Sequence, residues 1–338
     1  MLEPPDLPAE AIVGCLRQAY GIDAAQATFL PLGADEHTAV YRVVTASGPC
    51  YFLKLRRGAF DATPVTLTNY LAGQGIRAVI PPLATTIGRL WADMGEFSAI
   101  LYPFVEGSDG FAVTLTPQQW AEFGAALRRV HSLTLPPALA GQIRCETYSP
   151  RWRDALRHAM ARLDAAVDDP AARHLAALLV EKRGEIALML ERAGSLAQTL
   201  LADPRPNVLC HSDVHAGNVL VDRTGALYIV DWDEPIYAPK ERDLMFPGGA
   251  QGFIGHSPAE EEALFYQGYG PTYGDRPALA YYRYERIVTD LAIFCEQLLF
   301  TTEGGGDRPQ WLGWARANFA PGGTLEAACR VDGGAVPG

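Results

Sequence analysis

The segment HSDVHAGN, residues 211–218, places two histidines, an aspartate and an asparagine between the apolar runs NVLC and VLVD. Two kinds of chemistry fit these residue types. In a metal-dependent hydrolase, the alternating His211, Asp213 and His215 would be ligands. In a phosphotransferase, Asp213 would orient an attacking hydroxyl and Asn218 would bind magnesium. Residues elsewhere in the chain have to discriminate between the two.

The metal-hydrolase interpretation needs further ligands, because a catalytic zinc ion usually takes three protein ligands and keeps one open position. The other histidines are dispersed along the chain and form no ligand-like cluster: His37, His131, His158, His174 and His256. The six cysteines include no CxxC pair. We therefore expect the cysteines to be small buried residues in a reducing compartment, and we favour the phosphotransferase.

Phosphoryl transfer needs an acceptor for the hydroxyl proton, ligands for a divalent cation and a cation on the other phosphates. Asp213 suits the first role. The segment VLVDRTGALYIVDWDE predicts a β-hairpin that returns Asp231 beside Asn218. An amide and a carboxylate oxygen suit a hard cation such as Mg²⁺. Lys54, within the strand-like CYFLKLR, is the candidate phosphate-binding cation.

The elements that position these residues change character along the chain. Residues 7–20 predict a helix that ends at Gly21. Strands are predicted in AVYRVV, YFLKLR, TTIGRLWA and FSAILYPFV, with a further helix over residues 64–75. This pattern is typical of a small antiparallel sheet with one or two helices.

The second half of the chain is mainly helical. Thr116 is a predicted helix N-cap with Pro117 in the first turn, and residues 150–200 and 258–320 have helical patterns. The β-rich segment 207–232 interrupts them and holds the HSDVHAGN motif.

These patterns predict an α+β protein with a small antiparallel-sheet N-lobe and a large, mainly helical C-lobe. We expect a nucleotide-binding lobe over residues 1–101 and a hinge or crossover over 102–110. A helical lobe with the catalytic loop and the substrate site follows over 111–330, and the tail, 331–338, is expected to be disordered.

The bulk properties restrict the partners. The net charge of −11 argues against nucleic acid, which requires a basic surface; the acidic surface either favours a cationic small molecule or only serves solubility. No apolar run approaches the ~18 residues of a membrane span. The acidic, proline-rich start MLEPPDLPAE does not have the pattern of a targeting peptide. We expect a cytoplasmic protein without a membrane partner; the sequence does not indicate an oligomeric state.

Together the motifs resemble the aminoglycoside phosphotransferase family, which has the bilobal protein-kinase-like fold. The matching segments cover most of the chain: LGADEHTAVYRV, YFLKL, ILYPFVEG, LCHSDVHAGNVLVD, YIVDWDEP, APKERDLMF and YYRYERIV. The combination of HxDxxxxN with a following DWD is highly specific. The later segments are most similar to the spectinomycin 9-phosphotransferases, whereas LGADEHTAVYRV, with one glycine, is weak evidence.

The resemblance implies roles for individual residues. Asp213 corresponds to the catalytic aspartate, and His211 to the histidine that braces its loop. Asn218 and Asp231 correspond to the magnesium ligands, and Lys54 to the lysine that contacts the α- and β-phosphates.

The resemblance also implies how the nucleotide is bound. Residues 101–105 correspond to the interlobe hinge, so Leu101, Tyr102 and Phe104 are expected at the adenine and Gly33 in the nucleotide loop. Asp243 is expected to brace the catalytic loop from below.

One feature departs from the kinase-like pattern. Such folds commonly pair the strand lysine with a glutamate of the next helix, but residues 58–75 contain no glutamate. Asp61, a water molecule or the nucleotide itself would have to hold Lys54.

The implied activity is Mg²⁺-dependent transfer of a phosphoryl group from ATP, with GTP as an alternative donor, to a hydroxyl of an aminocyclitol or aminoglycoside antibiotic. Spectinomycin is the expected acceptor. Candidate contacts to this cationic, hydroxylated substrate are Asp233, Glu234, Glu241, Tyr284, Glu285 and Asp290. Two alternatives remain: a kinase for another small alcohol, such as choline, an amino sugar or a biosynthetic intermediate, and a catalytically silent nucleotide-binding protein.

Overall fold

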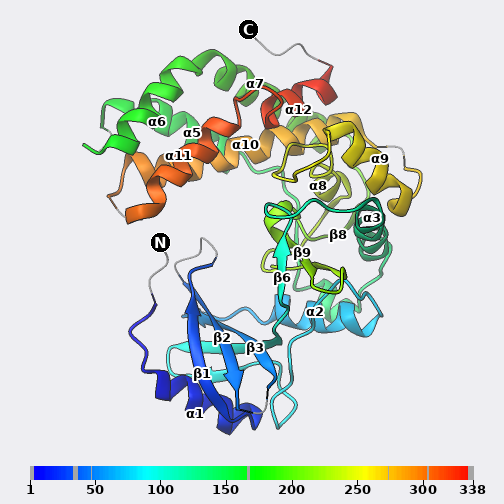
Figure 1. Cartoon of the computed structure of the whole chain (residues 1–338). Helices are drawn as coiled ribbons and strands as arrows, with labels where there is room; N and C mark the ends of the chain where they lie inside the picture. The colour runs from blue at the N-terminus through cyan, green and yellow to red at the C-terminus, as the bar shows by residue number, and fades with distance from the viewer. Residues whose placement is uncertain are drawn as a thin grey trace. The chain divides into compact units, whose positions relative to one another are not determined.

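Figure 1 shows the computed structural model, which describes residues 4–32, 37–46, 48–165, 168–272, 274–302 and 304–333. The chain divides into two compact units. The first unit comprises the residues up to Val113 together with Thr134–Ile143 and Gly217–Pro235; the remaining segments form the second unit. This division differs from the predicted one, because two later segments of the chain return to the N-terminal unit.

The first unit is built on a five-stranded antiparallel sheet with the strand order β1-β2-β3-β5-β4. Its strands are β1 (Ala24–Leu30), β2 (Thr38–Thr45), β3 (Cys50–Arg57), β4 (Ala92–Met94) and β5 (Phe97–Pro103). Helix α1 (Ala9–Tyr20) ends at Gly21, which has a φ of 67°. Leu16 of α1 belongs to the same buried cluster as Leu53 and Leu55 of β3, so the apolar face of the helix covers the core of the sheet.

The strand predicted over TTIGRLWA is wrong, because that segment forms a turn. The N–H of Thr85 donates to the carbonyl of Arg89, and the Thr85 hydroxyl accepts from the N–H of Arg89. Gly88 between them has a φ of 81°, and β4 begins only at Ala92. The side-chain hydroxyl thus offers the backbone an alternative to a strand ladder.

The returning segments add a three-stranded sheet to the first unit, with the order β10-β9-β6. Its strands are β6 (Gly107–Asp109), β9 (Val219–Asp222) and β10 (Leu227–Ile229). Gly107 allows the close approach of β6 to β9, since a Cβ atom there would lie 2.2 Å from the carbonyl oxygen of Val221. The helices of this unit are α1, α2 (Thr63–Gly73) and α4 (Pro137–Ala140).

The second unit is mainly helical, as predicted. Its helices are α3 (Pro117–His131), α5 (Arg151–Met160), α6 (Pro170–Glu181), α7 (Arg183–Ala202), α8 (Glu241–Leu244), α9 (Pro258–Tyr269), α10 (Arg276–Leu299), α11 (Arg308–Ala317) and α12 (Thr324–Asp332). Helix α10 packs against α5, α6, α7, α8, α11 and α12, so it forms the centre of this unit (Figure 1). A small sheet with the order β7-β11-β8 completes it: β7 (Arg144–Cys145), β11 (Ile236–Pro239) and β8 (Asn207–Cys210).

Two local features of the second unit bear on the sequence predictions. Thr116 caps α3 as predicted, in a reciprocal capping box with Gln119. The predicted disordered tail is wrong for residues 331 and 332, which complete α12; residues 334–338 lie outside the described residues. No helix among the described residues is both long and apolar enough to span a membrane.

Candidate active site

The loop that follows β8 carries Asp213, and a buried carboxylate holds its backbone. Asp243 of α8 accepts hydrogen bonds from the N–H groups of His211, at 2.9 Å, and Ser212, at 2.7 Å. Ser212 has a φ of 79°, a conformation that a non-glycine residue keeps only when its surroundings enforce it. The N–H of Asp213 donates to Nδ1 of His211 at 3.2 Å. These hydrogen bonds hold the backbone of the loop, while the roles of His211 and Asp243 in catalysis stay predictions.

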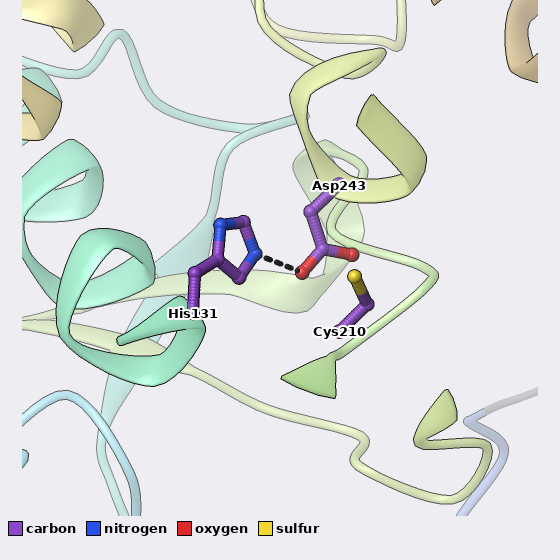
Figure 2. Close-up of side chains that lie close together, drawn as sticks. All are labelled: His131, Cys210 and Asp243. Atoms are coloured by element: carbon purple, nitrogen blue, oxygen red, sulfur yellow. Dashed lines mark hydrogen bonds and ion pairs between the residues drawn. The ribbon is translucent and has the colours of Figure 1, made fainter. Parts of the chain in front are cut away.

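Asp243 in turn interacts with a buried histidine. Nε2 of His131 lies 3.0 Å from an Asp243 oxygen, and Nδ1 of His131 lies 2.8 Å from the hydroxyl of Tyr269. Figure 2 shows His131 and Asp243 pointing toward each other, with Cys210 nearby. Burial raises the pKa of Asp243, but the hydrogen bond and charge of His131 outweigh it, so the pKa lies below its ordinary value. Asp243 is thus an ionised acceptor for the two backbone donors.

These contacts also bear on the metal-hydrolase alternative. Among the described residues, the one group of metal-ligating atoms close enough to share an ion belongs to His131, Cys210 and Asp243, not to the alternating residues of HSDVH. All three side chains have hydrogen-bonding partners within the protein; Cys210 donates to the carbonyls of β11. We therefore interpret these three side chains as support for the loop that carries Asp213.

The carboxylate of Asp213 contacts an arginine that the sequence did not single out. Nη1 of Arg286, in α10, lies 2.5 Å from Oδ1 of Asp213, and Nε of Arg286 lies 3.2 Å from Asp290. Nε2 of His215 lies 3.7 Å from Oδ2 of Asp213. Burial raises the pKa of Asp213, but the charges of Arg286 and the neighbouring histidines hold it below its ordinary value. Asp213 is therefore ionised at neutral pH.

Asn218 and Asp231 lie at one end of the β9–β10 hairpin in the first unit. Val219 pairs with Ile229, and beyond this pair the N–H of Val230 donates to the carbonyl of Asn218 at 2.9 Å. The register thus brings the two predicted magnesium ligands to the same end, as the sequence indicated. Asp231 has a φ of 62°, a second enforced backbone conformation. The amide oxygen of Asn218 and the carboxylate oxygens of Asp231 are ligands that suit a hard divalent cation.

Lys54 of β3 contacts both aspartates of the DWD motif. Its Nζ lies 2.6 and 2.7 Å from the two carboxylate oxygens of Asp233 and 3.3 Å from Asp231. Arg56 also contacts Asp233, at 2.8 Å. Burial lowers the pKa of Lys54, but the two carboxylates outweigh this effect and raise it. Lys54 is therefore a charged lysine whose acidic partners come from the hairpin.

This arrangement answers the question raised by the missing glutamate. Asp61, the acidic residue considered as its replacement, accepts a hydrogen bond from the N–H of Thr63 at the start of α2. Asp233, predicted as a substrate contact, instead occupies the position beside Lys54. The sequence did not indicate this pairing, because 179 residues separate the two side chains.

The residues predicted at the adenine are partly engaged in the sheet. Leu101 is fully buried in the core, and its carbonyl accepts from the N–H of Leu83 at 2.7 Å. The N–H of Phe104 donates to the carbonyl of Cys50 at 3.2 Å, and Tyr102 pairs with Phe52 of β3. Gly33 lies outside the described residues.

Three of the predicted substrate contacts have partners inside the second unit. Glu241 is buried and accepts from the N–H of Asp275. Tyr284 contacts Asp332 of α12, and Glu285 binds Arg153 at 2.5 Å. These contacts give each of them a structural role. Asp290 also has a partner in this unit, because it accepts a hydrogen bond from Nε of Arg286 at 3.2 Å, and Glu234 is an exposed residue of the first unit.

Several known proteins are similar to this chain. The model of the phosphotransferase enzyme family (APH) matches residues 28–282. Protein StrN of Streptomyces griseus is 31% identical over 225 residues, which cover 64% of this chain and 67% of that protein.

The solved structures include a spectinomycin phosphotransferase, APH(9)-Ia, in complex with ADP and spectinomycin. It is 34% identical, with a TM-score of 0.90 over 97% of this chain and 99% of that one. Amicoumacin kinase hAmiN, in complex with AMP-PNP, Ca²⁺ and Ami, is 17% identical with a TM-score of 0.61, over 92% of this chain and 93% of that one, and shares the fold. The predicted α+β kinase-like fold is confirmed. The chain belongs to the phosphotransferase enzyme family and is an enzyme that phosphorylates a hydroxyl group.

Proposed function

We propose that the enzyme transfers the γ-phosphoryl group of ATP to a hydroxyl of spectinomycin or a closely related aminocyclitol. The observation that carries the proposal is the likeness, over nearly the full length of both chains, to a phosphotransferase with ADP and spectinomycin bound. Lys54, Asp213, Asn218 and Asp231 supply the residue types that phosphoryl transfer requires. We place the reaction in the cytoplasm, where ATP is available.

Asp213 acts on the acceptor. As an ionised carboxylate with a low pKa, it accepts a hydrogen bond from the acceptor hydroxyl and directs its oxygen toward the γ-phosphorus. Transition states of phosphoryl transfer are loose, so positioning contributes more than early proton removal. Asp213 therefore takes the proton late. The brace from Asp243 keeps the loop backbone fixed during this step.

The first unit supplies the nucleotide contacts. Lys54 binds the α- and β-phosphates, and Asn218 and Asp231 hold Mg²⁺, which spreads the phosphate charge when bound. Hydrogen-bonding groups alternate between the two edges of a strand, and the N–H of Phe104 faces β3. The carbonyl of Pro103 and the N–H of Val105 therefore face the opposite edge. We assign these two groups to the adenine, with Leu101, Tyr102 and Phe104 as the scaffold that holds them.

The acceptor is a cation. The net charge of −11 favours the approach of a protonated amine. Asp290 and Glu234, whose side chains are at least partly exposed, are the carboxylates that we retain as candidate amine contacts. Glu241 and Glu285 are buried, and Asp233 is paired with Lys54.

The test measures ADP release from Mg·ATP with spectinomycin, several 2-deoxystreptamine aminoglycosides, choline and amino sugars as acceptors, with Asp213→Ala in parallel. We expect turnover with spectinomycin that the variant abolishes. Turnover with choline or an amino sugar alone would retain the kinase and refute the aminocyclitol acceptor. ATP binding without turnover on any acceptor would favour a catalytically silent protein.

A further inference from the structure

Arg286 connects the central helix of the second unit to the loop that carries Asp213. Its Nη1 lies 2.5 Å from Oδ1 of Asp213, and its Nε lies 3.2 Å from Oδ2 of Asp290, one turn further along α10. The guanidinium also lies over the ring of Phe246, 5.9 Å from the ring centroid. Arg286 is thus held on two sides while it contacts the catalytic carboxylate.

This arrangement limits the freedom of the Asp213 side chain. An aspartate on a loop can rotate about two side-chain torsions, and any misorientation of its oxygens weakens the alignment of the acceptor hydroxyl. The guanidinium fixes one oxygen. Helix α10 holds the backbone of Arg286 rigidly, because the adjacent residues Glu285 and Ile287 are buried in the core of the unit.

The charged groups around Asp213 come from its own loop and from α10. His211 and His215 approach it from its own loop, and Arg286 and Asp290 approach it from α10. Burial raises the pKa of both carboxylates, and the charge of Asp213 also raises the pKa of Asp290. Arg286 lies between the two carboxylates and offsets both effects.

We infer that Arg286 is a positioning residue of the phosphotransfer reaction, which orients the carboxylate of Asp213 and keeps it ionised. The inference rests on the proposed function of Asp213. It explains why Asp213 orients the hydroxyl and is a weak base: the countercharge that fixes its geometry also lowers its proton affinity.

The kinetic test compares Arg286→Gln, Arg286→Lys and Asp290→Asn. In Arg286→Gln we expect kcat to fall at least ~10-fold, while KM for ATP stays within about twofold. The acid limb of kcat/KM should move to higher pH by about one unit, because the half-buried carboxylate of Asp213 loses its countercharge. Lysine keeps the charge but cannot reach both carboxylates in the same geometry. Arg286→Lys should therefore keep the acid limb near its wild-type position and recover part of kcat.

Asp290→Asn and a surface variant serve as controls. Asp290→Asn removes the anchor of Arg286 and a negative charge, so kcat should fall without a shift of the acid limb to higher pH. Arg276→Gln, at the exposed start of the same helix, should match the wild type. Wild-type kcat in Arg286→Gln, or an unmoved acid limb, would overturn the inference. If Arg286→Gln does not fold, a lysine variant with the acid limb of the wild type supports the inference, and one with a displaced limb overturns it.

A measurement without substrate separates this inference from the acceptor proposal. Urea-unfolding midpoints are compared for Asp213→Asn, Arg286→Gln and the double variant. If the two side chains are coupled, the midpoint of the double variant differs from the sum of the single shifts. Additive shifts would refute the interaction between Asp213 and Arg286, whichever acceptor the enzyme phosphorylates. Coupled shifts without turnover on any acceptor would refute the proposed function and leave the pair established.

Discussion

Glu261 is a buried carboxylate away from the proposed chemistry, and it predicts how the stability of the enzyme depends on pH. It lies in α9, is 3% exposed and accepts a hydrogen bond from the N–H of Gly248 at 2.9 Å. Burial raises its pKa from 4.5 to about 7. The charge of Glu262 acts in the same direction, while those of His256 and Arg283 oppose it without cancelling the effect.

The sign and size of the effect follow from this pKa. The folded protein holds the proton of Glu261 more tightly than the unfolded chain, so this carboxylate costs no stability below pH 4.5. The cost grows as the pH rises and is complete above about pH 7. The difference between 4.5 and about 7, at about 1.4 kcal/mol per pH unit, gives about 3 kcal/mol. Glu261→Gln removes this cost, because the amide oxygen can accept from Gly248 without a charge.

The assay is urea unfolding of the wild type and Glu261→Gln at intervals between pH 4.5 and 8. We expect the free energy of unfolding of the variant, relative to the wild type, to rise by about 3 kcal/mol between pH 4.5 and 7 and then to level off. Glu260→Gln is the matched control, since the neighbouring Glu260 is exposed in the capping box of α9 and its pKa is lowered by the hydrogen bonds of Ser257. Parallel pH profiles for Glu261→Gln and the wild type would refute the reasoning.

Four further predictions concern single residues. Asp213→Ala should lower kcat at least ~10²-fold in the ADP-release assay, and near-wild-type turnover would remove Asp213 from the mechanism. Asp231→Asn removes the carboxylate of the proposed cation site, so the Mg²⁺ concentration needed for half-maximal turnover should rise at least ~10-fold; an unchanged Mg²⁺ dependence would contradict the assignment. Gly268→Ala should destabilise the second unit by at least ~2 kcal/mol in urea unfolding, because the new Cβ would lie 1.7 Å from the carbonyl oxygen of Ala121. Gly194→Ala, inside α7 with open space around its Cβ, should instead stabilise the protein by up to about 1 kcal/mol.

The local part of the site could be predicted from the sequence. The turn in VLVDRTGALYIVDWDE determines a hairpin register, and the register alone places Asp231 beside Asn218. The capping residues of α3 were likewise readable from neighbouring positions. In each case the partners are close in sequence, so local geometry decides the outcome.

The long-range part could not be predicted. Arg286 follows Asp213 by 73 residues, and the i, i+4 spacing of Arg286 and Asp290 was the one available signal that this arginine is held in place. The pairing of Lys54 with Asp233 depends in the same way on how β3 and the hairpin pack. The wrong prediction of a strand over TTIGRLWA has a different cause. The apolar residues of this segment suggested a strand, whereas the hydroxyl of Thr85 stabilises a turn.

The carboxylate of Asp243 also couples the conformation of the loop that carries Asp213 to the docking of α8. Asp243 follows the amides of His211 and Ser212 by 32 and 31 residues, so these two hydrogen bonds exist only while α8 is docked. Undocking of α8 would expose both amides to solvent and release Ser212 from its enforced backbone angle. The hydrogen-exchange rates of these two amides therefore report the free energy of this local opening. The enzyme is active only under conditions in which this local opening remains unfavourable.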